Sequence, residues 1–266
     1  MTTIKAALHV HSTFSDGELT IPELREVLLA EGFRVVCMAD HADGFDDQRV
    51  AAYIESCEAA SDDQICFVPG LEFGCEERMH IIGYGTTALV NSTDPETVIS
   101  HINRAEGLSV IAHPQTVHLT RIEGFQTLPK GIEAWNSKYD GRYAPRPAVF
   151  DLIERLRKRR PDLLAFYGQD LHWRRQYRGL TNTIELDRVN PGEILAALQL
   201  GEFSGHKDGQ TLPSNGVISA ELRQHYLTLH ARSHRILRVL RTIKRWSGPI
   251  GRALPAPLRS QLRRFL

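Results

Sequence analysis

The sequence predicts an α/β fold in which helices cover a parallel sheet, followed by a basic helical extension. Short apolar segments alternate with helical patterns through the first 210 residues, and threonine–glutamate capping boxes mark the starts of two helices. A chain of 266 residues is long enough to bury a large core. About seven strand–helix units of this kind would close into a barrel.

Seven apolar segments have the length and composition of strands. They are residues 4–11, 34–40, 65–73, 79–85, 108–114, 131–136 and 163–170. Most are continuous apolar runs, which are typical of parallel strands that are buried on both faces. We therefore expect the carboxyl ends of these strands to lie together at one face of the domain.

The first helices carry clear start and stop signals. Thr20 and Glu23 form a capping box, Pro22 lies in the first turn, and Gly32 ends the helix. An amphipathic pattern predicts a second helix near residues 47–60. Both helices follow a strand, as a strand–helix repeat requires.

The later helices follow the same arrangement. Thr93 and Glu96 predict a second capping box, and Gly107 ends that helix. Residues 147–160 and 190–202 predict two more helices, of which the last closes the repeat.

Histidine and acidic side chains lie at or just beyond the ends of the predicted strands. They include His9, His11, Asp40, His41, Glu72, His113 and Asp170. In a parallel barrel these ends share the face on which active sites are built. A carboxylate directly after a buried strand is costly unless it is paired or bound to metal. The pattern therefore favours a metal site.

The spacing of the histidines supports this interpretation. His9 and His11 are two apart on a strand, so their side chains point the same way and offer two nitrogens to a cation. Asp170 and His172 repeat this spacing, whereas Asp16 before Gly17 is equally well explained as a turn residue. Nine residues together predict a multinuclear metal site: His9, His11, Asp16, His41, Glu72, His80, His113, Asp170 and His172.

Six short motifs resemble those of the polymerase and histidinol phosphatase (PHP) superfamily in order and spacing. They are HVHSTFSDG, ADH, GLEF, the histidine before IIGYG, AHP and GQDLH. The resemblance covers roughly residues 4–205. It implies a distorted (β/α)7 barrel over residues 1–210 and a phosphoesterase that uses two or three divalent ions of zinc, manganese or iron.

The resemblance also implies how the ligands are shared. One ion would take His9, His11, Glu72 and Asp170, a second would take Asp16, His41 and His172, and a third would take Glu72, His80 and His113. Glu72 would then bridge two ions, and Glu72 and Asp170 would act in catalysis as ligands of the ions that activate water. Asp40 is expected to orient a ligand imidazole from outside the metal shell.

Basic side chains on loops at the same face are candidates for substrate contacts. They are Lys138, Arg142, Arg174, Arg175, His206 and Lys207. Basic loop residues are also common as solvated surface groups, so either interpretation fits the sequence.

The net charge of zero hides an asymmetry along the chain. Eleven basic residues and no acidic residue follow Glu221, which leaves 21 basic against 32 acidic residues in the body. An acidic body makes nucleic acid an unlikely partner, because binding a phosphate backbone depends on positive charge. The basic part belongs to a predicted C-terminal extension, residues 211–266.

Residues 225–246 within this extension have helical periodicity. Leu229, Ile236, Leu240 and Ile243 form an apolar stripe, and Arg235, Arg238, Arg241 and Arg245 lie opposite it. Such a helix fits an anionic membrane surface or a protein partner, and it fits packing of the stripe on the barrel equally well.

Several functions remain open from the sequence. The preferred one is a metal-dependent phosphoesterase that hydrolyses a small phosphorylated metabolite or nucleotide. Alternatives are a metallohydrolase of a non-phosphate ester or amide, a polymerase-associated nuclease, and a binding or regulatory module with the same barrel. No secretory signal or CxxC pair is present, so we expect a cytoplasmic protein, either free or peripheral at the membrane.

Overall fold

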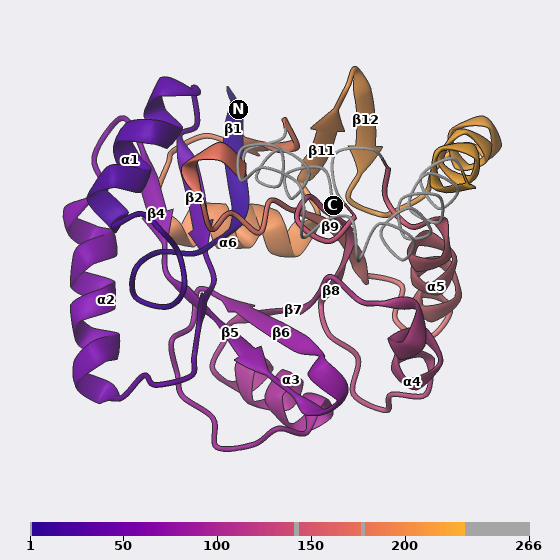
Figure 1. The fold of residues 1–266 in the computed structure, drawn as a ribbon, viewed down its shortest axis with the longest axis horizontal. Helices are drawn as coiled ribbons and strands as arrows, with labels where there is room; N and C mark the ends of the chain where they lie inside the picture. Colours follow the sequence, from indigo (N-terminus) through magenta and orange to yellow (C-terminus); the bar gives the residue numbers. More distant parts are fainter. Residues whose placement is uncertain (1, 141–143, 177–178, 232–266) are drawn as a thin grey trace, which may run out of the picture. The chain divides into compact units, whose positions relative to one another are not determined.

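The computed structural model describes residues 2–140, 144–176 and 179–231 (Figure 1). The chain divides into two compact units, of which the first ends at Ser219 and the second begins at Ala220. The predicted boundary between residues 210 and 211 falls inside a strand of the first unit, β12 (Gln210–Pro213).

Twelve named strands of the described chain form two mixed sheets of six strands each. The first sheet has the order β12-β11-β10-β1-β2-β4, and its other strands are β11 (Phe203–Lys207), β10 (Thr181–Leu186), β1 (Thr2–Val10), β2 (Val35–Met38) and β4 (Cys66–Val68). The second has the order β3-β5-β6-β7-β8-β9, with β3 (Asp40–His41), β5 (Gly70–Gly74), β6 (His80–Tyr84), β7 (Leu108–Ala112), β8 (Gly131–Asn136) and β9 (Leu164–Gly168). The fold is α/β, as the sequence predicts.

The two sheets are joined along two lines. On one side β2 continues into β3 through Ala39, and β4 continues into β5 through Pro69. On the other side β1 meets the end of β9, where the amide of Gln169 donates to Leu8 O at 2.8 Å and the amide of His11 donates to Leu171 O at 2.9 Å. The carboxyl ends of β1 and β9 therefore lie side by side.

Among the strands predicted from the sequence, β6 departs from the expected parallel arrangement. β6 runs antiparallel to both β5 and β7. The reason is the short connection over residues 75–79, because a parallel crossover needs a dozen or more residues. As a result His80, the first residue of β6, lies at the edge where the neighbouring strands have their carboxyl ends.

The helix signals of the sequence are confirmed at α1 (Ile21–Ala30). The Thr20 side chain accepts from the amide of Glu23, and the Glu23 carboxylate accepts from the amide of Thr20 at 2.8 Å. The second helix, α2 (Asp47–Ala59), begins after Asp46, whose carboxylate caps it. These caps satisfy amides that a helix start leaves unpaired.

The capping box predicted from Thr93 and Glu96 is wrong. α3 (Pro95–Arg104) is capped by Asp94, whose carboxylate accepts from the amide of Thr97 at 2.8 Å. Asp94 lies directly before the proline of the first turn, which makes it the residue in the N-cap position. Glu96 instead accepts from the backbone of a distant loop, at Gln126 and Thr127.

The helices lie outside the strands (Figure 1). α2 packs on β4, α3 packs on β6 and β7, and α5 (Pro147–Arg157) packs on β8 and β9. α6 (Pro191–Leu200) packs on β10 and β4, and the short α4 (Leu119–Glu123) lies against α5. The core between these layers is apolar, with fully buried Trp135, Tyr84 and Phe166.

The strands β10, β11 and β12 were not expected from the sequence. They add three antiparallel strands to β1. The signal of β10 is a period-two alternation, since Asn182, Ile184 and Leu186 are buried while the residues between them are not. None of the helices in the described part of the chain has the length and apolar character needed to cross a bilayer.

The second unit is described only over residues 220–231, which are helical. Of the predicted apolar stripe, Leu229 belongs to this segment. Ile236, Leu240, Ile243 and the arginines opposite them lie outside the described residues.

Candidate metal centre

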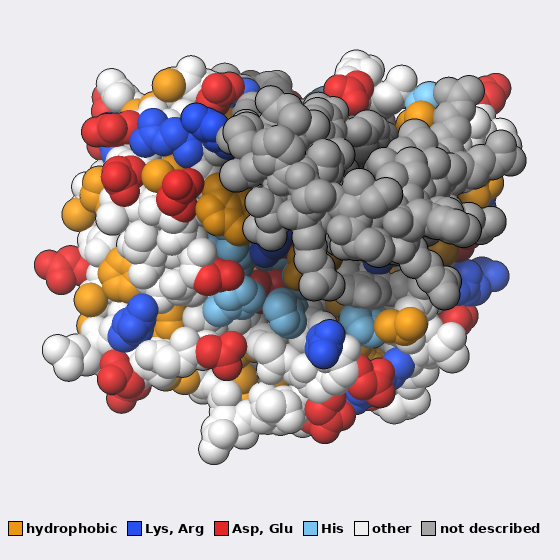
Figure 2. Space-filling model, viewed as in Figure 1, with side chains coloured by type: hydrophobic (Ala, Val, Ile, Leu, Met, Phe, Trp, Pro, Cys, Tyr) orange, Lys and Arg blue, Asp and Glu red, His pale blue; other side chains and the backbone are white. Residues whose placement is uncertain are grey.

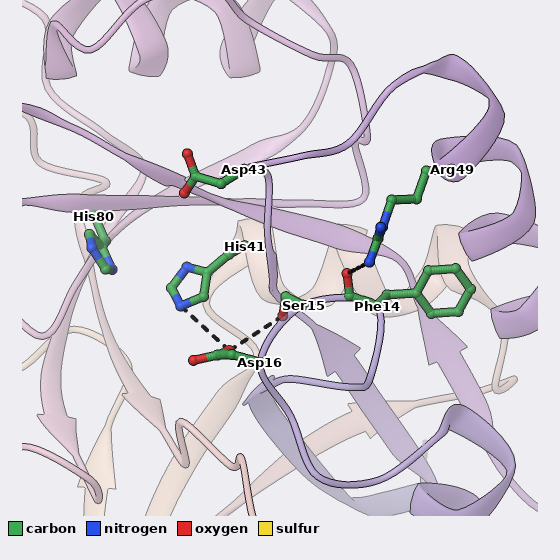
Figure 3. Close-up of a pocket in the computed structure, with 7 residues that line it drawn as sticks. All are labelled: Phe14, Ser15, Asp16, His41, Asp43, Arg49 and His80. Atoms are coloured by element: carbon green, nitrogen blue, oxygen red, sulfur yellow. Dashed lines mark hydrogen bonds and ion pairs between the residues drawn. The ribbon is translucent and has the colours of Figure 1, made fainter.

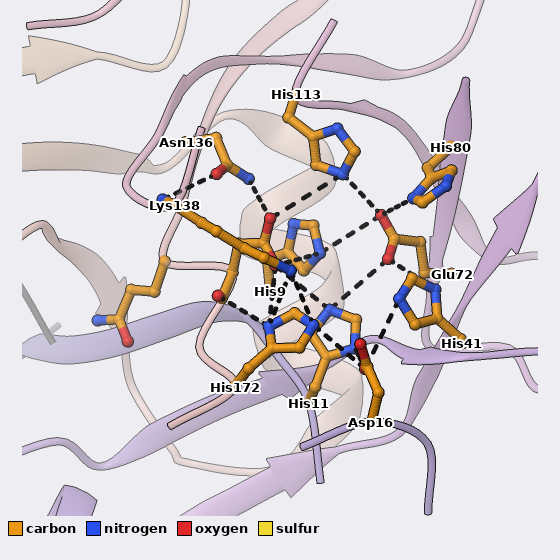
Figure 4. Close-up of polar contacts among 12 residues, drawn as sticks. His9, His11, Asp16, His41, Glu72, His80, His113, Asn136, Lys138 and His172 are labelled. Atoms are coloured by element: carbon orange, nitrogen blue, oxygen red, sulfur yellow. Dashed lines mark hydrogen bonds and ion pairs between the residues drawn. The ribbon is translucent and has the colours of Figure 1, made fainter. Parts of the chain in front are cut away.

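The nine predicted ligands lie together at the edge formed by the strand ends (Figure 4). They fall into four overlapping groups: His11, Asp16, His41 and His172; His9, His113 and Asp170; His9, His11 and Glu72; and His41, Glu72 and His80. Within each group the candidate ligand atoms lie within 4.8 Å of one another. Histidine side chains also gather on the visible face of the molecule (Figure 2). Buried clusters of this kind are consistent with a multinuclear metal site.

Glu72 of β5 is at the centre of the cluster. Its Oε1 lies 3.0 Å from His80 Nδ1 and 3.1 Å from His113 Nε2. Its Oε2 lies 3.1 Å from His41 Nδ1 and 3.6 Å from His11 Nε2. Because the carboxylate is buried and faces imidazoles on both oxygens, its position suits a ligand shared between two cations.

Asp16 and Asp170 bracket His172 on the other side. His172 Nε2 lies 3.1 Å from Asp16 Oδ1, and His172 Nδ1 lies 3.1 Å from Asp170 Oδ1. His41 Nε2 approaches the same Asp16 oxygen at 3.7 Å. The Asp16 carboxylate, which comes from a turn, therefore faces two imidazoles.

Three of the clustered residues have left-handed backbone conformations. The φ angles are +64° for His9, +29° for His113 and +50° for Asp170. At His9 this conformation interrupts the pairing of β1 with β2. The side chains of His9 and His11 therefore do not follow the regular alternation of a strand. Their ring centroids nevertheless lie 5.0 Å apart. Non-glycine residues adopt this region at a cost, and such strain concentrates at functional sites.

Several ring nitrogens in the cluster have no hydrogen-bond partner within the described chain. His9 Nε2 and both ring nitrogens of His11 are buried in this condition. An unpaired buried polar atom costs free energy unless something satisfies it. Since imidazole nitrogen is a preferred ligand of transition metals, the residues fit a bound cation.

A buried carboxylate supports the cluster from behind. Glu133 Oε1 lies 2.7 Å from His9 Nδ1, and Glu133 Oε2 accepts from the amide of His113 at 2.8 Å. Asn136 Nδ2 donates to Glu133 Oε2 at 2.9 Å and to Asp170 Oδ2 at 3.1 Å. Sequence reasoning missed Glu133 because it lies inside the predicted strand 131–136.

The buried Asp40 carboxylate is hydrogen-bonded to the loop that carries Asp16. Its carboxylate accepts from the amide of Ser12 at 2.8 Å, from Ser12 Oγ at 2.9 Å and from Ser15 Oγ at 2.6 Å. These bonds hold the loop that carries Asp16, and burial raises the pKa of the Asp40 carboxyl. These bonds are made with the loop, and the expected role of Asp40 in orienting an imidazole stays a prediction; at His9 the carboxylate that contacts Nδ1 is that of Glu133.

Burial and the neighbouring charges act in opposite directions on the pKa values of Glu72 and His9. Burial alone would raise the pKa of Glu72, but His9, His113 and His80 hold it well below its usual value. Burial would lower the pKa of His9, but the neighbouring carboxylates hold it well above its usual value. For His11, burial dominates and lowers its pKa. A cation bound at His9 Nε2 would require the neutral imidazole, because the nitrogen that binds a metal must be deprotonated.

Comparison with known proteins identifies the family. The model of the PHP domain family matches residues 7–171. The chain belongs to the PHP domain family. The resemblance found in the sequence is thereby confirmed, and no curated protein sequence matches this PHP chain.

Solved structures share the fold of this PHP protein. A two-domain protein from Bacteroides vulgatus, described as containing a predicted PHP-like metal-dependent phosphoesterase, has a TM-score of 0.57 at 14% identity over 86% of this chain and 70% of its own. PsfC from Pseudomonas syringae has a TM-score of 0.54 at 12% identity over 89% of this chain and 100% of its own. A lesion-specific endonuclease from Pyrococcus furiosus has a TM-score of 0.53 at 16% identity over 74% of this chain and 56% of its own.

Of the basic residues predicted to contact substrate, Lys138 lies at the PHP cluster. Its Nζ is 3.0 Å from His172 Nε2 and 3.4 Å from Asp170 Oδ1. Arg174 and Arg175 lie on an exposed 3-10 turn directly after the cluster. Arg142 lies outside the described residues.

The hydrogen bonds of the two remaining candidates, His206 and Lys207, are made with residues outside the cluster. His206 of β11 bonds Thr183, Ser204 and Thr211. The Lys207 ammonium donates to Asp208 at 2.8 Å. These contacts belong to the β10–β12 part of the first sheet.

An open pocket of about 360 Å³ adjoins the PHP cluster (Figure 3). It is lined by Phe14, Ser15, Asp16, His41, Asp43, Arg49 and His80. Arg49 of α2 faces it and donates to Phe14 O at 2.6 Å. Sequence reasoning missed Arg49, because a basic residue in a surface helix carries no signal that separates it from solvated neighbours.

Proposed function

We propose that this PHP protein is a metal-dependent phosphoesterase that hydrolyses a small phosphorylated metabolite or nucleotide at a site of two or three divalent ions. The observation that carries the proposal is the convergence of nine ligand-type residues, Glu72 among them, with buried ring nitrogens left unpaired. A single ion uses at most about six such ligands, so nine favour more than one ion. The proposal is supported by the structural relative from Bacteroides vulgatus, which is described as containing a predicted PHP-like metal-dependent phosphoesterase.

We propose the ligand sets implied by the family. The first ion would take His9, His11, Glu72 and Asp170; the second would take Asp16, His41 and His172; the third would take Glu72, His80 and His113. The grouping of His11, Asp16, His41 and His172 supports the second set, and the position of Glu72 supports its sharing. Zinc, manganese or iron would suit these nitrogen and oxygen donors.

We further propose that the strands close into the distorted (β/α)7 barrel of the family. The hydrogen bonds between β1 and the residues after β9 support one closing line. The continuity of β2 with β3 and of β4 with β5 supports the other. Such a closure would place all the ligands at one mouth of the barrel.

The residues around the ligands define the chemistry that the site would perform. When bound, the ions would supply Lewis acidity and neutralise charge on a phosphoryl group. The Lys138 ammonium would hold a phosphate oxygen, since it lies between His172 and Asp170 at the edge of the cluster. Arg49 would supply a second positive charge from the pocket side.

The proposal is tested by metal analysis together with a substrate screen. Elemental analysis of the purified protein should find two to three equivalents of transition metal, and phosphomonoesters and phosphodiesters should be turned over when the ions are present. One equivalent or less, not restored by added manganese, would contradict the multinuclear site. Turnover of carboxylic esters or amides alone would instead assign the site to a different hydrolase class.

A further inference from the structure

Two exposed aromatic side chains lie beside the candidate metal ligands. The Tyr139 ring is 4.3 Å from the His113 ring, and the Trp173 ring is 5.5 Å from the His172 ring, centroid to centroid. Tyr139 is 43% exposed and Trp173 is 48% exposed. Among the residues that the structure describes, the other large exposed hydrophobic side chains are aliphatic.

A positive charge lies near both rings. Lys138 Nζ is 5.6 Å from the centroid of Tyr139 and 5.9 Å from the centroid of Trp173. The same ammonium is 3.0 Å from His172 Nε2. A phosphate held at the cluster beside Lys138 would therefore have an aromatic surface within a few ångströms of it.

The loop that carries Tyr139 is held in place by buried groups. The amides of Lys138 and Tyr139 both donate to Asn136 Oδ1, at 3.0 and 3.1 Å. The amide of Ser137 donates to Gly168 O at 3.0 Å, and its hydroxyl donates to Gln169 O at 2.5 Å. The ring is thus presented from a fixed backbone, which lowers the entropic cost of using it as a binding surface.

The loop that carries Trp173 is fixed in a similar way. The buried Gln176 side chain accepts from the amides of His172 at 2.7 Å and Trp173 at 3.3 Å. It also donates to Asp170 O at 2.6 Å. The Gln176 side chain therefore links the backbone of the candidate ligands Asp170 and His172 to the backbone of Trp173.

We propose that Tyr139 and Trp173 bind a planar aromatic group of the substrate. The inference rests on the phosphoesterase function proposed above and narrows its substrates to phosphate esters that carry an aromatic ring, either nucleotides or aryl phosphates. Stacking on a tyrosine or tryptophan face is tolerant of which ring is bound, because every such ring offers a π surface. Lys138 recognises the phosphate and the two rings recognise the group attached to it.

The competing explanation is that the two rings only shield the imidazoles from solvent. A shielding role predicts that removing a ring weakens all phosphate ligands equally, through disturbed metal ligands. A binding role predicts a loss confined to ligands that carry a ring. The two explanations are separated by comparing ligands with and without a ring.

The test uses three non-hydrolysable phosphonates, so that affinity is measured independently of turnover. Methylphosphonate has no ring, phenylphosphonate represents aryl phosphates, and the phosphonate analogue of AMP represents nucleotides. Each is titrated into the metal-loaded full-length protein by calorimetry. At least one ligand that carries a ring should bind about tenfold or more tightly than methylphosphonate. The AMP analogue binding best assigns a nucleotide, and phenylphosphonate binding best assigns an aryl phosphate.

The variants Trp173→Ala and Tyr139→Ala should each lower the affinity of the preferred ligand by about fivefold or more and leave methylphosphonate within about twofold. Trp173→Phe should restore part of the loss, and Leu200→Ala, which removes an exposed side chain of α6, should change neither affinity. Equal affinities for all three phosphonates, or equal losses for all three in the variants, would overturn the inference. A ring preference in a protein that hydrolyses no phosphate ester would contradict only the phosphoesterase function.

Discussion

His9 Nδ1 lies 2.7 Å from Glu133 Oε1, and both side chains are fully withdrawn from solvent. The contact leaves His9 Nε2 facing Glu72 Oε1 at 3.5 Å and Asp170 Oδ1 at 3.8 Å. The second oxygen of Glu133 accepts from the amide of His113. One carboxylate therefore orients the first candidate ligand of the chain and positions the backbone of another.

Replacing Glu133 by Gln should weaken metal binding about 10- to 100-fold, since groups that orient a ligand imidazole contribute this much. The amide keeps the size of the side chain but loses the charge that holds the His9 ring. Metal affinity is measured by competition with a chelator of known affinity. Glu58→Gln, at an exposed position of α2, is the matched control and should leave the affinity unchanged. Equal affinities for Glu133→Gln and the control would show that Glu133 has no role in metal binding.

Replacing Glu72 by Ala should remove more metal and activity than replacing His80 by Ala. Glu72 is buried and lies within 3.1 Å of three imidazoles, whereas His80 is 24% exposed and its nearest carboxylate is Glu72 itself. Elemental analysis and turnover of a phosphomonoester are compared for the two variants. Similar losses in both would contradict the bridging position of Glu72.

The sequence predicted which histidine and acidic side chains gather at the strand ends, because a polar residue at the end of an apolar strand can be recognised from the sequence alone. A histidine or carboxylate at or just beyond the end of a buried apolar strand is costly unless it is paired or bound to metal, and this holds for His113 and Asp170. The position of His80 depends on the antiparallel direction of β6, which follows from the short connection between β5 and β6. Glu133 carried the same signal as the others, a charge within a buried strand, but it lay before the strand end.

The helix starts also show that the spacing of residues in the sequence does not always identify the capping residue. Thr20 and Glu23 form the capping box that their spacing predicts, whereas Thr93 and Glu96 do not. The difference is Asp94, a stronger cap that lies one residue closer to Pro95. Arg49 and the two aromatic rings could not be assigned at all, because only the folded chain places them beside the ligands.

The cap of α3 should contribute a pH-dependent part of the stability. Hydrogen bonds from the Thr97 hydroxyl and amide hold the pKa of Asp94 below its usual value. A lowered pKa means that the stabilisation is present above the unfolded pKa, about 3.9, and is lost as the pH falls through the lower folded value. Asp94→Ala should therefore lower the free energy of unfolding by about 1 kcal/mol at pH 7, with a smaller difference below about pH 4.

Urea unfolding at pH 7 and pH 3.5 measures this difference. Thr93→Ala is the matched control, because the side chain at this position is not the cap, and it should change the stability by less than about 0.5 kcal/mol. A larger effect for Thr93→Ala than for Asp94→Ala would restore the capping box first expected from the sequence.

The basic extension should be separable from the chemistry. The ligand residues end at His172 and the first compact unit ends at Ser219, so a chain truncated after Ser219 should keep its metals and its turnover of a small substrate.

If the arginines of residues 225–246 attract anionic surfaces, the full chain should bind phosphatidylserine-containing vesicles more tightly than the truncated chain. The difference should shrink as salt rises and vanish on neutral vesicles, because the attraction is screened and needs anionic lipid. A truncated chain that fails to fold would instead assign the apolar stripe from Leu229 to Ile243 to packing. A truncated chain that folds and keeps its metals but loses turnover would assign the extension to substrate binding.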